Sequence, residues 1–289
     1  MKLNVFAHCA IDTITIDGNN YEQIGGAACY SGITARQFKF DVDLFTKFGP
    51  DFPKQYLDEH KINLINSESQ KNTTKFAISI TGSDRTLKLE NECDPIDYSQ
   101  SDADAHLVNP IYHEISGDIF KKIKSDSNFL FVDPQGFLRR KDSQNNIFLE
   151  KTNLDLSDVN AIKVNPEESQ QIVSGTHDEM MLALQKKGVE YVLLTDKSNV
   201  SLLVKDKIYS ITLPNLRIHD TTGVGDIFCS AFTCTMLKEK DFLWALCFAG
   251  GAAQAALESN NVGLQKIPKK GTVQTNASYF YNLVKFRDL

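Results

Sequence analysis

The sequence lacks several features that mark particular classes of protein. No cluster of lysine and arginine stands out, and the formal net charge of the 289 residues is −6, so nucleic-acid binding is not expected. No apolar run approaches the roughly 20 residues that a membrane span needs, and residues 1–7 have the pattern of a short strand rather than a signal peptide. Low-complexity linkers and internal repeats are also missing. A cytoplasmic protein with neither nucleic-acid nor membrane partners is therefore expected.

Cysteine is scattered, and no two of the six residues form a Cys-x-x-Cys pair. A zinc site is therefore not expected, and the thiols should be reduced and mostly buried, as in a cytosolic protein. The six are Cys9, Cys29, Cys93, Cys229, Cys234 and Cys247. With 42% hydrophobic and 24% charged residues, the composition is typical of a folded protein with one large domain or two small ones.

The most informative segment is Asp-Thr-Thr-Gly-Val-Gly-Asp-Ile-Phe, at residues 220–228. Apolar residues follow it at helical spacing, so Gly223, Val224 and Gly225 should lie where a loop turns into a helix. Such a site attracts anions, because the first N–H groups of a helix have no partners within it. The carboxylate of Asp226 would stand beside this site, which suits phosphoryl transfer to a hydroxyl. A bare Gly-x-Gly-Asp is explained equally well as an ordinary loop–helix junction.

The longer string resembles the C-terminal signature of the ribokinase-like (PfkB) carbohydrate kinases, with Val224 where that family usually has Ala. It is neither a Rossmann fingerprint, because the third glycine would fall at Phe228, nor a Walker A loop. The resemblance implies a kinase that uses ATP and Mg²⁺. Asp226 would be the general base, and the amides of Gly223, Val224, Gly225 and Asp226 would hold the transition-state charge.

Strand and helix patterns alternate along the chain, which predicts an α/β fold with a mostly parallel sheet. Expected strands are 3–9, 43–48, 106–108, 128–133, 161–164 and 191–195, and residues 73–90 predict a hairpin. Expected helices are 26–38, 52–60, 114–124, 143–150, 167–173, 177–187 and 242–257, the last capped by Asp241. This order resembles the ribokinase fold over nearly the whole chain. It implies a single three-layer domain, 1–289, with a small β lid at about 12–24 and 72–98.

Two early segments acquire a role through the resemblance. Taken alone, Asp12 is a turn acid, and Gly25-Gly26 punctuates the loop before a helix. The resemblance implies that Asp12, Gly25 and Gly26 bind the substrate. It implies the same for Tyr30, which stands where the family often has Asn. Ala10 also replaces a usual Asn. These departures favour a polyol or a non-ribose sugar as acceptor, and His8 resembles the start of inositol-type and archaeal-type members.

Residues 133–139 follow a strongly apolar strand and resemble the Asp-to-Arg segment at the same place in sugar kinases. Asp133, Gln135 and Arg139 are therefore candidates for substrate contact. The alternative is a turn in which the proline and the glycine act locally. Both explanations fit the sequence equally well.

The segment 163–168 matches the family's Lys-x-Asn-x-x-Glu box. In that box Asn165 and Glu168 would bind Mg²⁺ through water, as suits an ion that prefers oxygen and keeps its waters. The same residues also fit a helix N-terminus with Asn as the cap and Pro at the first position, and both roles can hold. The implied nucleotide-binding residues are Lys163, Thr195, Thr222, Asn260 and Gly263.

The expected function is transfer of the γ-phosphoryl group of ATP to a hydroxyl of a sugar or polyol. A nucleoside kinase, a kinase of vitamin precursors and a catalytically idle ligand-binding sensor are the alternatives. The intact Gly-x-Gly-Asp disfavours the sensor, and the hairpin at 73–90 favours the sugar-kinase branch over the vitamin kinases. A homodimer through the lid is also expected, because an exposed sheet edge invites pairing.

Overall fold

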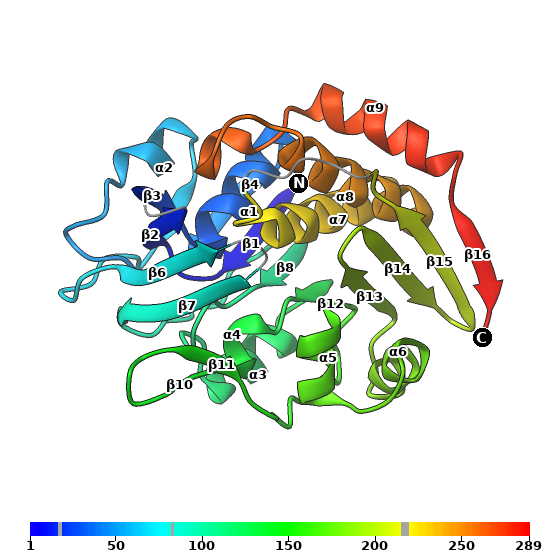
Figure 1. Ribbon diagram of the computed structural model, residues 1–289, viewed down its shortest axis with the longest axis horizontal. Coiled ribbons are helices and arrows are strands. Elements are labelled where there is room, and N and C mark those ends of the chain that lie inside the picture. The colour runs from blue at the N-terminus through cyan, green and yellow to red at the C-terminus, as the bar shows by residue number, and fades with distance from the viewer. Residues whose placement is uncertain (17–18, 82–83, 215–219) are drawn as a thin grey trace.

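The computed structural model describes residues 1–16, 19–81, 84–214 and 220–289. Within these ranges the centre of the molecule is a ten-stranded sheet, in the order β16-β15-β14-β13-β12-β9-β8-β1-β4-β5 (Figure 1). Its strands are β1 (Lys2–Phe6), β4 (Asp41–Phe45), β5 (Asn63–Ile65), β8 (Ala105–Val108), β9 (Leu130–Val132), β12 (Ala161–Val164), β13 (Tyr191–Asp196), β14 (Asn199–Val204), β15 (Lys207–Thr212) and β16 (Lys285–Asp288).

The strands from β13 to β5 in this order pair in parallel, and β14, β15 and β16 continue the sheet in antiparallel fashion. The prediction of a mostly parallel sheet is therefore confirmed. β1 lies between β4 and β8, so the chain builds the sheet first in one direction and then in the other. Such a reversal leaves a crevice at the carboxyl ends of the strands, which is where ligands bind in open α/β sheets.

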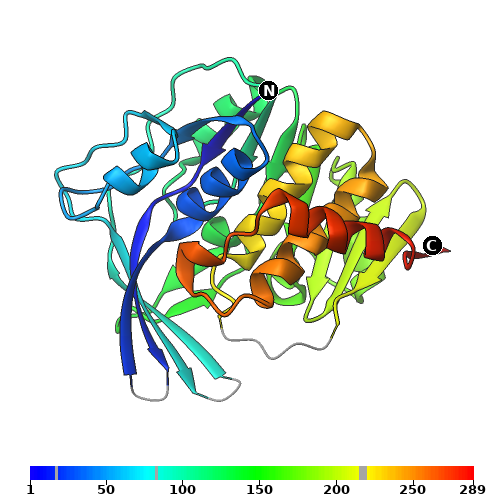
Figure 2. The same cartoon turned by 90° about the horizontal axis from the view of Figure 1, so that it is seen from above.

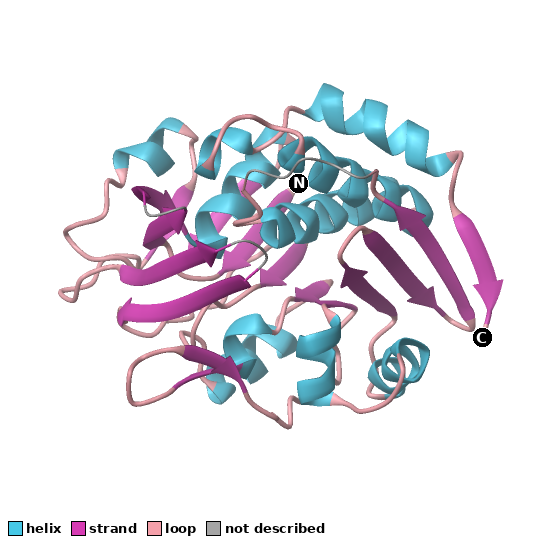
Figure 3. Ribbon diagram, in the orientation of Figure 1, coloured by secondary structure: helices cyan, strands magenta, loops and turns pink. Residues whose placement is uncertain are grey.

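Helices cover both faces of the sheet, as Figures 1 and 3 show. One face carries α1 (Gly26–Gln37), α7 (Val224–Glu239), α8 (Phe242–Leu257) and α9 (Lys270–Tyr281), and the other carries α3 (Gly117–Ser125), α5 (Pro166–Ile172) and α6 (His177–Lys186). Since both faces are covered, alternate residues of a strand enter different cores. In β1, Leu3 and Val5 belong to one core, and Phe6 belongs to the other.

A second, four-stranded sheet has the order β3-β2-β6-β7 and extends from one end of the body (Figure 2). Its strands are β2 (Ala10–Ile16), β3 (Asn19–Gly25), β6 (Thr74–Thr81) and β7 (Asp84–Asn91). β6 and β7 pair antiparallel, which confirms the hairpin expected over 73–90. The strands fall in the two parts of the chain expected to form a lid, and residues 17–18 and 82–83 lie outside the described residues.

The helix expected over 143–150 is wrong. The chain there forms β11 (Ile147–Leu149), which pairs antiparallel with β10 (Arg139–Lys141). The turn between them is fixed by Asp142, whose Oδ1 accepts hydrogen bonds from the N–H groups of Gln144 and Asn146. A short polar side chain that binds its own backbone in this way competes with helix formation.

Most other expected helices are present with small shifts at their ends. The helix expected over 114–124 begins at Gly117, because the Ser116 hydroxyl accepts a hydrogen bond from the N–H of Ile119. Asp241 caps α8 as predicted, accepting hydrogen bonds from the N–H groups of Leu243 and Trp244. The short helices α2 (Gln55–Glu59), α4 (Gln135–Leu138) and η1 (Gly263–Lys266), a 3₁₀ turn, connect larger elements. All the cysteines are buried, free thiols, as predicted. Within the described ranges, no helix has both the length and the apolar character to cross a membrane.

Candidate active site

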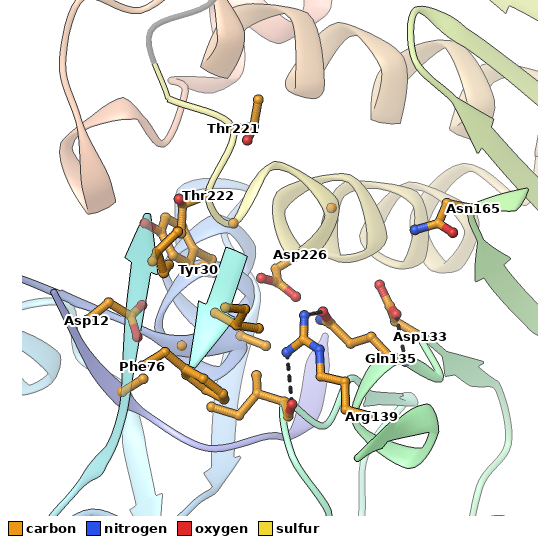
Figure 4. A pocket seen from close by; sticks show the side chains of 18 of the residues that line it. Asp12, Tyr30, Phe76, Asp133, Gln135, Arg139, Asn165, Thr221, Thr222 and Asp226 are labelled. Atoms are coloured by element: carbon orange, nitrogen blue, oxygen red, sulfur yellow. Dashed lines mark hydrogen bonds between the residues drawn. The ribbon is translucent and has the colours of Figure 1, made fainter. Parts of the chain in front are cut away.

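A cavity of about 250 Å³ lies at the carboxyl ends of the parallel strands, under the four-stranded sheet and beside the start of α7 (Figure 4). Asn109, Asp133 and Asn165 directly follow β8, β9 and β12, so each strand delivers one polar side chain to this edge. In Figure 4, Asp226 lies between Asp12 on one side and Asn165 on the other. The cavity thus has two ends with a carboxylate between them.

The start of α7 forms one wall of the cavity, through Thr222, Gly223, Gly225 and Asp226. Gly223 is the N-cap residue with φ +74°, in the left-handed region that favours glycine. A Cβ at this position would lie 2.4 Å from the ring of Tyr30, so glycine is required for space as well. The loop-to-helix junction predicted at these glycines is therefore present. Val224 does not line the cavity, and its N–H donates to the Thr221 carbonyl oxygen at 3.3 Å.

Asp226 is buried in the first turn of α7. Burial and the nearby carboxylate of Asp133 raise its pKa to about 7, against the lowering effects of Lys163, Asn109 and Arg139. The Oδ1 atom accepts a hydrogen bond from the Asn109 side chain at 3.1 Å. A carboxyl group with a pKa near neutral pH can accept a proton and release it again, which is what a general base requires.

Asn109 was not among the predicted site residues. Its amide also donates to the Ser31 hydroxyl at 2.7 Å, and that hydroxyl donates to the backbone oxygen of Asp226 at 3.3 Å. This network joins β8, α1 and α7 around the carboxylate. The sequence carried a usable signal for Asn109, because a polar residue directly follows a buried parallel strand there.

Lys163 lies on the cavity wall among acidic groups. Its ammonium is 3.0 Å from Asp133 Oδ2 and 3.8 Å from Glu168 Oε2. Burial by itself lowers the pKa of Lys163, but the two carboxylates outweigh burial and raise it above the usual value, so the group is a cation. Gly225 brings the start of α7 close to this cation, since a Cβ there would lie 3.4 Å from Nζ. Asp133 is therefore engaged within the protein as well as lining the cavity.

The helix-cap role expected for Asn165 and Glu168 is present. The Asn165 side chain accepts from the N–H of Glu168 at 2.8 Å, and the Glu168 carboxylate accepts from the N–H of Asn165 at 2.9 Å. Both side chains also line the cavity. Burial raises the pKa of Glu168, and Asp133 raises it further, although Lys163 acts in the opposite direction.

The donor set at this end fits magnesium held through water. Asn165 and Glu168 offer the oxygen ligands that Mg²⁺ prefers, while the ion usually keeps several of its waters. Within the described ranges, no group of three or more His, Cys, Asp or Glu side chains is arranged to hold a metal ion directly. The residues present therefore suit an ion bound mainly by phosphate oxygens and water.

The opposite end of the cavity combines Asp12 and Tyr30 with an apolar wall. Burial, with the carboxylates of Asp220, Asp12 and Asp226, raises the pKa of Tyr30 well above its usual value, so the side chain is a neutral hydroxyl. In the described part of the chain this buried hydroxyl has no hydrogen-bond partner. The apolar residues of this wall, which the sequence did not single out, are Phe76, Ile78, Leu87 and Ile111.

Arg139 and Gln135 line the cavity together and bind each other. The guanidinium donates to Gln135 Oε1 at 2.7 Å and to the Ile111 carbonyl oxygen at 2.8 Å (Figure 4). It also lies 5.9 Å from the centre of the Phe76 ring. Arg139 thus connects α4 with the apolar wall. Of the two glycines, Gly26 lines the cavity and Gly25 does not. A Cβ at Gly25 would lie 3.1 Å from Asp12 Oδ2.

The remaining nucleotide-binding candidates do not line this cavity. The Thr195 hydroxyl donates to the Val164 carbonyl oxygen at 3.5 Å, and Asn260 is exposed. The N–H of Gly263 donates to Asp220 Oδ2 at 3.1 Å, which ties its loop to the start of the signature segment. For these three residues a nucleotide contact stays a prediction.

Together the fold and the cavity define a kinase of the ribokinase type. The chain belongs to the pfkB family of carbohydrate kinases, whose family model matches residues 12–270. Comparison with curated protein sequences gives no match.

Several solved structures share the fold. A pyrophosphate-dependent kinase in the ribokinase family, complexed with a pyrophosphate analogue and myo-inositol, superposes with a TM-score of 0.81 and 18% identity over 94% of this chain and 99% of that one. The ribokinase of Arabidopsis thaliana, complexed with ribose and ATP, superposes with a TM-score of 0.73 and 16% identity, over 95% of this chain and 98% of that one. The nucleoside kinase of Methanocaldococcus jannaschii superposes with a TM-score of 0.74 and 16% identity, over 96% of this chain and 98% of that one.

Proposed function

We propose that this protein transfers the γ-phosphoryl group of ATP to a hydroxyl of a sugar or polyol, with Asp226 as the general base. The observation that carries the proposal is the position of Asp226. It is buried in the cavity wall, with a pKa raised to about 7, at the glycine-bracketed start of a helix. A proton acceptor and an anion-binding helix start then meet at one point.

The transfer would be a direct displacement. The acceptor hydroxyl gives its proton to the Asp226 carboxylate while its oxygen forms a bond to the γ-phosphorus. The bond from that phosphorus to the bridging oxygen breaks, and its electron pair leaves with ADP. The amides at the start of α7 and the nearby ammonium of Lys163 would stabilise the negative charge of the transition state. Magnesium, held through water by Asn165 and Glu168, would neutralise charge on the donor phosphates.

The acceptor would bind at the end that contains Asp12. The carboxylate there can accept hydrogen bonds from two neighbouring hydroxyls. The Tyr30 hydroxyl, which has no hydrogen-bond partner among the described residues, can donate one. Phe76, Ile78 and Leu87 would pack against the C–H face of a ring. A cyclic polyol or a sugar ring has this combination of a polar edge and an apolar face. One structural neighbour carries myo-inositol, which is an acceptor of this kind.

A nucleoside is the second candidate acceptor. The apolar wall formed by Phe76, Ile78, Leu87 and Ile111 could contact a flat base as well as a sugar ring. The cavity of about 250 Å³ lies below the ~300–1,000 Å³ range of drug-sized ligand sites, which favours the smaller sugar or polyol. Pyrophosphate is the second candidate donor, because a structural neighbour depends on it.

The test is a matrix of donors and acceptors. ATP or pyrophosphate, each with Mg²⁺, is combined with inositols, pentoses, hexoses and nucleosides, and ADP or phosphate release is measured. Asp226→Asn should lose about 10²–10⁴-fold in turnover on whichever pair is active, as expected for a general base. Asp43→Asn is the matched control, since Asp43 is also a buried acid but pairs with Lys2 away from the cavity. Near-normal turnover of Asp226→Asn would refute the assignment of the base.

The four-stranded sheet would act as a lid and as a dimer contact. It covers the acceptor end of the cavity with Phe76, Ile78 and Leu87, so closure would exclude water and limit ATP hydrolysis. β3 is at one edge of this sheet and carries the exposed side chain of Tyr21. Pairing of two such edges would give the proposed homodimer. Light scattering of wild type and a β3 proline variant, Glu22→Pro, tests this, and a monomeric wild type would contradict it.

A further inference from the structure

Lys266 is fully buried at the end of η1, beside the start of the signature segment. Its ammonium lies 2.8 Å from Asp220 Oδ2, and it donates to the Asp220 carbonyl oxygen at 3.0 Å. It also lies 5.8 Å from the centre of the Tyr30 ring, within cation–π range. Buried lysines of this kind are rare and need compensation, so this arrangement calls for an explanation.

Asp220 converts this ion pair into a link between two loops. Its Oδ1 accepts from the N–H of Thr222 at 2.8 Å, and its Oδ2 accepts from the N–H of Gly263 at 3.1 Å. Burial alone would raise the pKa of Asp220, but Lys266 and these hydrogen bonds outweigh burial and hold it below the usual value. The carboxylate is therefore charged, and it holds the residues that lead into α7.

Tyr30 connects the Lys266–Asp220 pair with the start of α7. Its ring contacts Lys266 on the one hand and is packed against Gly223 on the other, where a Cβ would lie 2.4 Å away. The conformation of Gly223, with φ +74°, decides where the first amides of α7 point. A change in the Lys266–Asp220 pair would therefore be transmitted to the anion-binding wall by the backbone of 220–223 and by the Tyr30 ring.

We propose that Lys266 is a positioning residue, a cation built into the chain that holds residues 220–223 in the conformation that receives the transferred phosphoryl group. This inference rests on the proposed function. The carboxylate and the carbonyl oxygen of Asp220 converge on one point, and two such oxygens repel each other unless a cation lies between them. Because the chain supplies that cation itself, wild-type turnover should be the same in sodium, potassium, ammonium and choline chloride.

The test compares Lys266→Ala with Lys124→Ala. Lys124 is the matched control, because it is also a buried lysine paired with an aspartate, Asp155 at 2.6 Å, but it lies on α3, on the opposite face of the sheet from α7. Lys266→Ala should lose about 10²-fold in kcat, as for a misplacement of the reacting groups. The space left by the missing side chain should admit a small cation, so ammonium or potassium should restore a measurable part of that loss in Lys266→Ala, whereas choline should not. Lys124→Ala should keep wild-type kcat in every salt.

Other outcomes would overturn the inference. Wild-type kcat in Lys266→Ala would show that Lys266 acts only in stability. A loss of kcat that no small cation relieves in a folded variant would show that the charge of Lys266 is not what positions residues 220–223. If Lys266→Ala does not fold, Asp220→Asn/Lys266→Met removes both charges of this ion pair together. That double variant should fold and still lose kcat, and normal turnover would refute the positioning role.

Failure of the proposed function would be recognised separately. If wild type phosphorylates no acceptor, the proposed reaction is wrong. The role of Lys266 is then tested by calorimetry, which measures the affinity of each variant for magnesium pyrophosphate. Lys266→Ala should weaken that binding about ten-fold, with recovery in ammonium chloride, since the helix start would no longer present its amides correctly. Equal binding by Lys266→Ala and wild type would overturn the inference, whatever the reaction.

Discussion

The side-chain amide of Asn109 donates a hydrogen bond to the carboxylate of Asp226, with 3.1 Å between Nδ2 and Oδ1. Asn109 follows β8 at the centre of the sheet, and Asp226 belongs to the first turn of α7. This bond therefore fixes the proposed base relative to the sheet edge that carries Asp133 and Asn165. It also favours the charged form of the carboxyl group, since an N–H donor stabilises a carboxylate.

Asn109→Ala should lower kcat about ten-fold or more, because the base would lose a partner that orients it. It should also shift the acid limb of the pH–rate profile to higher pH, because the lost hydrogen bond favoured the ionised form. Asn63→Ala is the control, since Asn63 makes the same type of bond to Asp43 at 2.9 Å away from the cavity. An unchanged pH profile in Asn109→Ala would show that the bond does not act on the base.

The wild-type pH profile should have an acid limb near neutral pH. The pKa of Asp226 is raised to about 7, and the carboxyl group must be ionised to accept the hydroxyl proton. kcat/KM should therefore fall about ten-fold per pH unit below that value and level off above it. Initial rates at fixed ionic strength from pH 5 to 9 measure this. A flat profile down to pH 5 would contradict a base with this pKa.

Asp226→Asn should make the protein more stable at high pH while it removes activity. The folded-state pKa of about 7 lies above the ordinary value of 3.8, so the folded state holds a proton that the unfolded chain has lost between these values. The free energy of unfolding of wild type therefore falls as pH rises from 3.8 to about 7. Above this range the full destabilisation by the buried, ionised carboxylate is present. Thermal unfolding at pH 8 should give the Asp226→Asn variant a Tm at least about 2 °C above wild type, which corresponds to roughly 1 kcal/mol. The difference in Tm between the variant and wild type should be smaller at pH 5. A difference that is the same at both pH values would mean that ionisation of Asp226 is not its cause.

The sequence predicted the parallel core of the fold because buried strands and amphipathic helices have distinct periods. It did not predict β14, β15 and β16, which extend the sheet in antiparallel fashion. It also placed a helix over 143–150, where the chain instead forms β11 and part of the turn that precedes it. The deciding feature there was the Asp142 side chain, which closes a turn on its own backbone.

For the site, the motif residues were predicted from the sequence, whereas Asn109 and Lys266, which support them, were not. Gly223, Gly225 and Asp226 stand in one short string, and the structure brings them together with Asp12 and Lys163 from distant segments. Lys266 carries no local signal, since an isolated lysine in a loop is normally exposed. Its burial depends on Asp220 and Tyr30, which approach it only in the folded chain.

Replacement of Gly223 by alanine should strongly slow phosphoryl transfer, with a moderate loss of stability. The residue has φ +74°, which L side chains rarely adopt, and its Cβ would meet the Tyr30 ring at 2.4 Å. Backbone strain of this kind costs about 1–3 kcal/mol. Relief of the clash would move either the helix start or Tyr30, so kcat should fall at least about 10²-fold.

Gly117→Ala provides the comparison for this substitution. Gly117 also stands at the start of a helix, α3, but a Cβ there would have no heavy atom within 4 Å. Alanine in a helix is favoured over glycine by about 1 kcal/mol, so this variant should be at least as stable as wild type and fully active. Denaturant unfolding and steady-state kinetics of both variants test the difference. If Gly223→Ala kept wild-type turnover, the geometry of the helix start could not be what positions the transferred phosphoryl group, because any side chain there must displace it or Tyr30.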